Sequence, residues 1–144
     1  LAAAAMTYAL QADLVDRFGS TEIAQLTDRI NGTVIDATVL GRALADADAE
    51  IDSYLAARYS LPLASAPTAL VRVAADIARY RLFDDRVTDA VRARYQDAVA
   101  YLKQISLGNV VIDGASPLTP AATAMAVKSS SPEKTFNDDL LGLY

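Results

Sequence analysis

The stretch DATVLGRALADADAEIDSYLAARY, residues 36–59, decides the fold of this chain. Its apolar side chains recur every three or four residues, a spacing that places them in one stripe along an α-helix. Asp36 stands before the stripe, where an aspartate can accept hydrogen bonds from the first free backbone N–H groups. We therefore predict a long helix from Asp36 to about Tyr59. Its single apolar stripe consists of Val39 or Leu40, Ala43, Leu44, Ala47, Ile51, Tyr54, Leu55 and Arg58.

The opposite side of this predicted helix is small and nearly uncharged. It carries Ala45, Ala49, Ser53 and Ala56. Small side chains let a neighbouring helix approach closely, because the distance between packed helices depends on the side chains at the contact. Two interpretations remain open for these four residues: a solvent-exposed alanine surface, or a contact with another subunit.

Four acidic residues flank the apolar stripe, namely Asp46, Asp48, Glu50 and Asp52. They do not suggest a metal site, because helix residues two positions apart point to opposite sides. We expect them to form a solvated or subunit-facing acidic surface.

A second long helix is predicted from Pro67 to about Asp84. Its apolar residues cover most of the circumference, which is typical of the central helix of a bundle. The narrow polar strip consists of Arg72, Asp76 and Arg79. Because residues three and four positions apart are neighbours on a helix, we predict structural ion pairs among these three side chains.

A third long helix is predicted between two local signals, an N-cap at Thr88 and a glycine just past the helix end at Gly108. Two short helices precede the long ones, at residues 10–18 and at about 20–28, with Ser20 as the cap of the second. The predicted fold is therefore all-α: a compact bundle of three long helices plus short N-terminal helices, with an extended C-terminal tail.

The chain divides into three parts by composition. We expect the native protein to begin at Met6, which makes residues 1–5 extraneous, and we expect residues 6–108 to form one helical domain. Residues 109–144 form the tail, with a short strand at 110–112 and a turn at 113–114. Alanine, serine, threonine and proline dominate residues 115–134, and such a stretch cannot build a core. The chain then regains apolar anchors, which we interpret as a docking peptide rather than a frayed end: Phe136, Leu140, Leu141 and Tyr144.

Composition argues against several classes of protein. The chain has no cysteine and no histidine, so it lacks thiolate zinc sites, the commonest general base and the commonest transition-metal ligand. No phosphate-binding loop or nucleophile elbow is present. We predict that the protein is not an enzyme, with no catalytic, cofactor-binding or metal-binding residues. Its net charge of −5 argues against tight binding to nucleic acid or an anionic membrane.

Several blocks of sequence together resemble a known family. They are DLVDRFG at residues 13–19, RALADA at 42–47, EIDSYL at 50–55 and ADIARY at 75–80. In these blocks the chain resembles a conserved domain of Mu-like tailed phages and prophages, which is similar to the head–tail connector proteins of long-tailed phages, also called adaptor or head-completion proteins. The blocks are structural and contain no catalytic signature.

The resemblance implies an α-helical virion protein at the phage neck, made in the host cytoplasm. Connectors of this type form a ring, commonly of twelve subunits, below the portal protein. Their C-terminal tails reach the portal, their opposite face receives a stopper or tail-completion protein, and genome DNA passes through the channel without sequence-specific binding. No membrane and no cofactor are implied. The alternative is a helical regulatory or scaffolding module that binds a host protein through the same tail.

Overall fold

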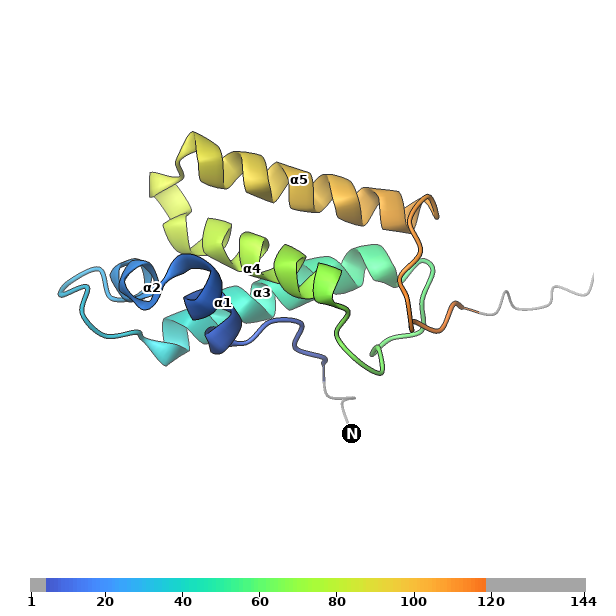
Figure 1. Ribbon diagram of the computed structural model, residues 1–144, viewed down its shortest axis with the longest axis horizontal. Helices are drawn as coiled ribbons and strands as arrows, with labels where there is room; N and C mark the ends of the chain where they lie inside the picture. Colours follow the sequence, from blue (N-terminus) through green and yellow to red (C-terminus); the bar gives the residue numbers. More distant parts are fainter. Residues whose placement is uncertain (1–4, 119–144) are drawn as a thin grey trace, which may run out of the picture.

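The computed structural model describes residues 5–118, which form an all-helical body. This confirms the predicted fold class. Within the described residues there are five α-helices, which are labelled in Figure 1, and one short 3₁₀-helix. In chain order they are α1 (Gln11–Phe18), α2 (Ser20–Thr27), α3 (Ala37–Leu55), α4 (Thr68–Phe83), η1 (Asp84–Arg86) and α5 (Asp89–Ser106).

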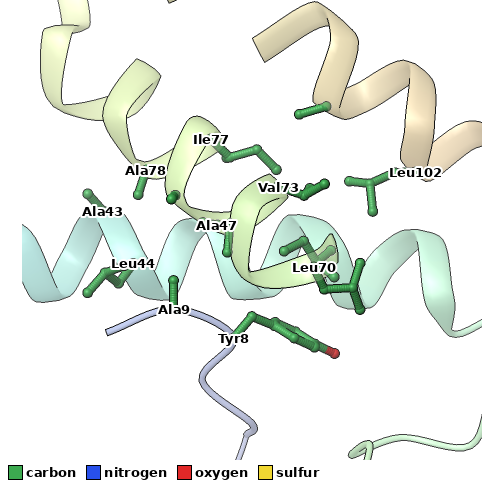
Figure 2. Packing of buried hydrophobic residues seen from close by; sticks show 14 of the residues in the cluster. Tyr8, Ala9, Ala43, Leu44, Ala47, Leu70, Val73, Ile77, Ala78 and Leu102 are labelled. Carbon is green, nitrogen blue, oxygen red and sulfur yellow. The ribbon is translucent and has the colours of Figure 1, made fainter. Parts of the chain in front are cut away.

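Helix α4 lies between α3 and α5 (Figure 1). Helix α1 packs against α2 and α4, and α2 packs against α3 and α4, toward one end of the bundle. The central position of α4 explains why its sequence is apolar on most sides. In Figure 2, Val73 of α4 and Leu102 of α5 point toward each other, and Ala47 of α3 lies close to α4. The buried residues of α4 are Leu70, Val73, Ala74, Ala75, Asp76, Ile77, Ala78 and Leu82.

The start of α3 confirms the predicted cap. The Asp36 carboxylate accepts hydrogen bonds from the backbone N–H groups of Thr38, at 2.9 Å, and of Val39, at 3.1 Å. The helix ends at Leu55, four residues earlier than predicted. The backbone N–H groups of Arg58 and Tyr59 both bond to the carbonyl of Leu55 at 2.9 Å, so the chain closes into a turn that buries the Tyr59 side chain.

Both predicted ends of α5 are confirmed. The Thr88 hydroxyl accepts a hydrogen bond from the Val91 backbone N–H at 3.3 Å. At the other end Gly108 has a φ of +82°, which glycine adopts readily. The N–H groups of Gly108 and Asn109 bond back to the carbonyls of Ile105 and Gln104, each at 3.0 Å. This is the hydrogen-bond pattern of a Schellman motif.

Helix α2 begins differently from the prediction. Gly19, with a φ of +89°, occupies the N-cap position, and Ser20 is the first helical residue. The predicted capping role of Ser20 is therefore wrong. Glycine is tolerated at an N-cap almost as well as a polar residue, and here it also allows the sharp turn from α1 into α2.

The folded body continues past the predicted domain boundary at Gly108. Ile112 is buried in the core, and no strand forms at 110–112. Among residues 5–118 the β-pairing is confined to a single antiparallel bridge between Tyr59 and Pro117. The body therefore extends at least to Leu118, because Ile112 is buried in the core and the Leu118 N–H donates to the Arg58 carbonyl.

Candidate interaction surfaces

The proposed subunit-contact residues of α3 share one exposed face. Ala45, Ala49, Ser53 and Ala56 are all exposed. The Ser53 hydroxyl donates a hydrogen bond to the Glu50 carbonyl at 2.6 Å, so this polar side chain is already satisfied within its own helix. The face is thus small and close to apolar in character, as a close helix–helix contact requires.

An N-terminal strap, residues 6–10, crosses another side of α3. Tyr8 and Ala9 are buried although they precede the first helix (Figure 2). The Tyr8 backbone N–H donates to Asp48 Oδ1 at 3.0 Å, and the Tyr8 hydroxyl donates to Asp52 Oδ1 at 2.5 Å. Two turns of α3 therefore hold one residue of the strap.

The strap corrects the expectation for the acidic residues of α3. Asp48 is buried rather than solvated. Burial raises the pKa of the Asp48 carboxyl, and the hydrogen bond from the Tyr8 N–H opposes this rise. Burial and the neighbouring Asp52 carboxylate also raise the pKa of Tyr8, so its hydroxyl stays protonated and remains a donor at neutral pH.

A second acidic residue of α3 connects all three long helices. Glu50 accepts a hydrogen bond from the Tyr95 hydroxyl of α5 at 2.8 Å and pairs with Arg81 of α4 at 3.1 Å. The Tyr95 ring stacks on Tyr80 with a centroid distance of 4.0 Å. Burial, together with the bond to Glu50, raises the pKa of Tyr95 to about 12. Glu50 is thus a structural residue at the junction of three helices.

Asp76 and Arg79 of α4 both form ion pairs, but with residues of other helices, so the predicted pairs within α4 are wrong. Arg79 Nη2 instead pairs with Glu22 of α2 at 2.6 Å, and the guanidinium lies 4.4 Å from the ring centre of Phe18. Asp76 pairs with Arg94 of α5, at 3.7 Å. Within residues 5–118, neither Arg72 nor Arg79 forms an ion pair with Asp76. Because α4 is central, neighbouring helices lie close enough to compete with the contacts along its own surface.

Asp76 is nevertheless surrounded by positive charge. Burial raises the pKa of its carboxyl, whereas the charges of Arg94, Arg72, Arg17 and Arg79 oppose the rise. These arginines come from α1, α4 and α5, so the arrangement stabilises the packing of three helices around one buried carboxyl.

Residues 58–60 and 108–118 form an exit clamp, which holds the chain where it leaves the described body. The Ser60 N–H donates to the Ser116 carbonyl at 3.0 Å, and the Leu118 N–H donates to the Arg58 carbonyl at 2.8 Å. The Ile112 N–H donates to the Tyr59 hydroxyl at 3.1 Å. The clamp fixes Leu118, the last described residue, on the body.

The predicted portal-docking residues Phe136, Leu140, Leu141 and Tyr144 lie outside the described residues. Between residues 5 and 118, no group of three or more acidic, histidine or cysteine side chains is arranged to hold a metal ion. No helix of the described body combines the length and the apolar character needed to cross a membrane.

Comparison with known proteins shows that the chain is similar to a family of phage proteins. A family model described as Bacteriophage Mu, Gp36 matches residues 8–130, from the strap tyrosine to beyond the exit clamp. The chain is 35% identical over 103 residues to the Mu-like prophage FluMu protein gp36 of Haemophilus influenzae, covering 72% of this chain and 73% of that protein. It is 40% identical over 105 residues to gene product J of Escherichia phage Mu, covering 72% and 74%.

Proposed function

This chain belongs to the Bacteriophage Mu Gp36 family, and on that premise we propose that it is the head–tail connector of a tailed phage. In this role it is a structural virion protein of the neck. It forms a ring, commonly of twelve subunits in connectors, beneath the portal protein. The ring joins the DNA-filled head to a stopper or tail-completion protein.

One observation carries this proposal: residues 5–118 enclose a core of their own, and a clamp holds the end of this part of the chain on the body. Ile112 completes the core, Leu118 is held by the Arg58 carbonyl, and residues 119–144 follow. The apolar residues Phe136, Leu140, Leu141 and Tyr144 lie far beyond this point in the sequence. Such a segment is suited to bind a partner, which we take to be the portal.

Repeated weak contacts account for durable attachment. An apolar side chain that moves from water into a pocket contributes roughly 1.5–3 kcal/mol. A ring presents many copies of the same segment to the head, so the contacts act together. Attachment therefore does not require any single segment to bind tightly.

The exposed face of α3 supports lateral contact within the ring. Ala45 and Ala49 allow a helix of the next subunit to approach closely. A contact between two different surfaces repeats from subunit to subunit and closes into a ring when the rotation permits. The net charge of −5 is suited to a channel through which DNA slides without sequence-specific binding.

Truncation after Lys134 tests the proposal. The truncated protein is expected to keep the helical circular dichroism spectrum and melting temperature of the full chain, because residues 5–118 contain the core. It should fail to attach to heads that carry a portal but were assembled without this protein. If truncated protein completes heads at the normal rate, docking through the C-terminal segment is wrong.

Electron microscopy of the same heads separates the connector from the regulatory or scaffolding alternative. A connector adds a ring at the neck of each head. A module that binds a host protein through its tail adds no density there.

A further inference from the structure

Five of the six large exposed apolar side chains among residues 5–118 lie at opposite ends of the bundle, and the sixth, Leu10, lies directly before α1. Ile30 and Val34 lie in the loop between α2 and α3, at one end of the long axis (Figure 1). Leu107, Val111 and Leu118 lie at the other end, where the described chain finishes. We call these last three residues the exit surface. Val111 is the most exposed of the three, at 79%.

The exit surface is held in place rather than loosely attached. Leu118 is bonded through its N–H to the Arg58 carbonyl. The Arg58 guanidinium packs against Gly108, the residue after Leu107, so closely that a Cβ there would lie 2.5 Å from Arg58 Cζ. Val111 directly precedes Ile112, which is buried and bonded to Tyr59. All three apolar side chains therefore flank residues that are fixed in the body.

A cavity of about 270 Å³ opens beside Val111. Its walls include Pro67, directly before α4, Leu70 from the first turn of α4, and Tyr101 from α5. Most of this lining is apolar, so the cavity suits an apolar side chain from another protein.

We propose that the exit surface and this cavity seat the same partner that takes the C-terminal segment, and that this partner inserts an apolar side chain beside Val111. The inference rests on the proposed function, in which that partner is the portal. The chain passes over the exit surface at Leu118 before it reaches Phe136, so a protein that holds Phe136 is tethered to this end of the bundle. Tethering raises the effective concentration of the partner at nearby surfaces.

The positions of the exposed apolar residues at both ends of the bundle also indicate which end faces the portal. A connector contacts one partner on the head side and another on the tail side. The exit surface and the Ile30 loop occupy opposite ends of one body, so a single partner covers only one of them (Figure 1). Leu118, from which the sequence continues toward Phe136, lies on the exit surface, and we therefore assign that end to the head side.

Matched variants of the full-length chain test this assignment. Val111→Asp places a charge on the exit surface, and Ile30→Asp places the same charge on an even more exposed residue at the other end. Each protein is titrated against portal-bearing heads that were assembled without it. Val111→Asp is expected to attach at least tenfold more weakly than the unmodified chain, and Ile30→Asp is expected to attach within twofold of it.

Equal attachment of Val111→Asp and the unmodified chain would overturn the inference, as would a loss in Ile30→Asp as large as that in Val111→Asp. If Val111→Asp melts at a lower temperature than the unmodified chain, Leu107→Gln replaces it with the same criteria. A change in the sedimentation of free Val111→Asp, with normal attachment to heads, would assign the surface to a second copy and also overturn the inference.

The truncation after Lys134 is measured in parallel. Normal attachment of the truncated chain contradicts the proposed function. Lost attachment of the truncated chain combined with normal attachment of Val111→Asp contradicts only the role of the exit surface.

Discussion

The backbone N–H of Tyr8 donates a hydrogen bond to Asp48 Oδ1 at 3.0 Å, across 40 residues of sequence. One turn farther along α3, Asp52 accepts a hydrogen bond from the hydroxyl of the same tyrosine. The strap is therefore fixed by both its backbone and its side chain. Two aspartates that appear in the sequence as surface charges instead fasten the N-terminal segment to the bundle.

Removal of the Tyr8 hydroxyl should weaken this attachment. Tyr8→Phe keeps the buried ring but loses the hydrogen bond to the Asp52 carboxylate. Hydrogen bonds to charged groups contribute about 1.5–3 kcal/mol when buried, and this one is partly exposed, so we expect a loss of about 1–2 kcal/mol in unfolding free energy. Urea unfolding measures the loss. An unchanged midpoint would show that the hydroxyl contributes nothing.

The raised pKa of Asp48 predicts a pH-dependent difference between the unmodified chain and Asp48→Asn. A carboxyl whose pKa is higher in the folded state binds more protons there, so its stabilising contribution is complete below its unfolded value of 3.8. The contribution is lost as the pH rises through the folded pKa. Asparagine does not titrate, and it keeps an oxygen for the Tyr8 N–H.

Asp48→Asn should therefore gain stability relative to the unmodified chain as the pH rises from about 3.5 to 7. Urea unfolding of both proteins across this range provides the measurement. Because Asp76 also has a raised pKa and is present in both chains, the difference between them isolates Asp48. A constant difference, or one of opposite slope, would contradict the burial of a charged carboxylate at this position.

Replacement of two glycines by alanine should change the unfolding free energy in opposite directions. Gly108 has a φ of +82° and faces Arg58, so Gly108→Ala is expected to lower the unfolding free energy by about 1–2 kcal/mol. Gly41 lies within α3, and a Cβ added there would meet nothing within 4 Å, so Gly41→Ala is expected to raise the unfolding free energy by about 0.5–1 kcal/mol. Thermal and urea unfolding compare the pair. Equal effects of the two changes would contradict the left-handed helix end.

Substitution of one small residue by a bulky one can show whether the exposed face of α3 is a subunit contact or a solvent-exposed alanine surface. Ala49→Trp should leave the melting temperature nearly unchanged, because the residue is exposed, but should prevent ring formation on portal-bearing heads. Ala93→Trp on the exposed side of α5 is the matched control. Negative-stain images of the heads count the rings. Normal rings with Ala49→Trp would identify the face as solvent-exposed in the assembly.

Local signals in the sequence predict most of the fold. Asp36, Thr88 and Gly108 each mark a helix end through a contact with residues a few positions away, and all three contacts are present. The apolar periodicity also places α4 at the centre, because a helix buried on most sides has few polar positions. These features depend on neighbours in the chain, which a single sequence displays.

Sequence-based predictions fail where the partner of a residue is distant in the chain. The spacing within α4 pairs Asp76 with arginines of its own helix, but its ion pair is with Arg94 of α5. The buried Ile112 donates its N–H to the hydroxyl of Tyr59, 53 residues earlier, and no pattern around residue 112 reveals that contact. The Tyr8 strap escapes prediction for the same reason.

The central claim is that the terminal apolar residues find their binding site on a neighbouring protein. A cryo-electron microscopy map of the neck, at a resolution that traces side chains, tests it most directly. We predict density for residues 136–144 against the portal, with Phe136 and Tyr144 in contact with that second chain. Residues 136–144 packed into their own subunit, with no other chain touching them, would contradict it.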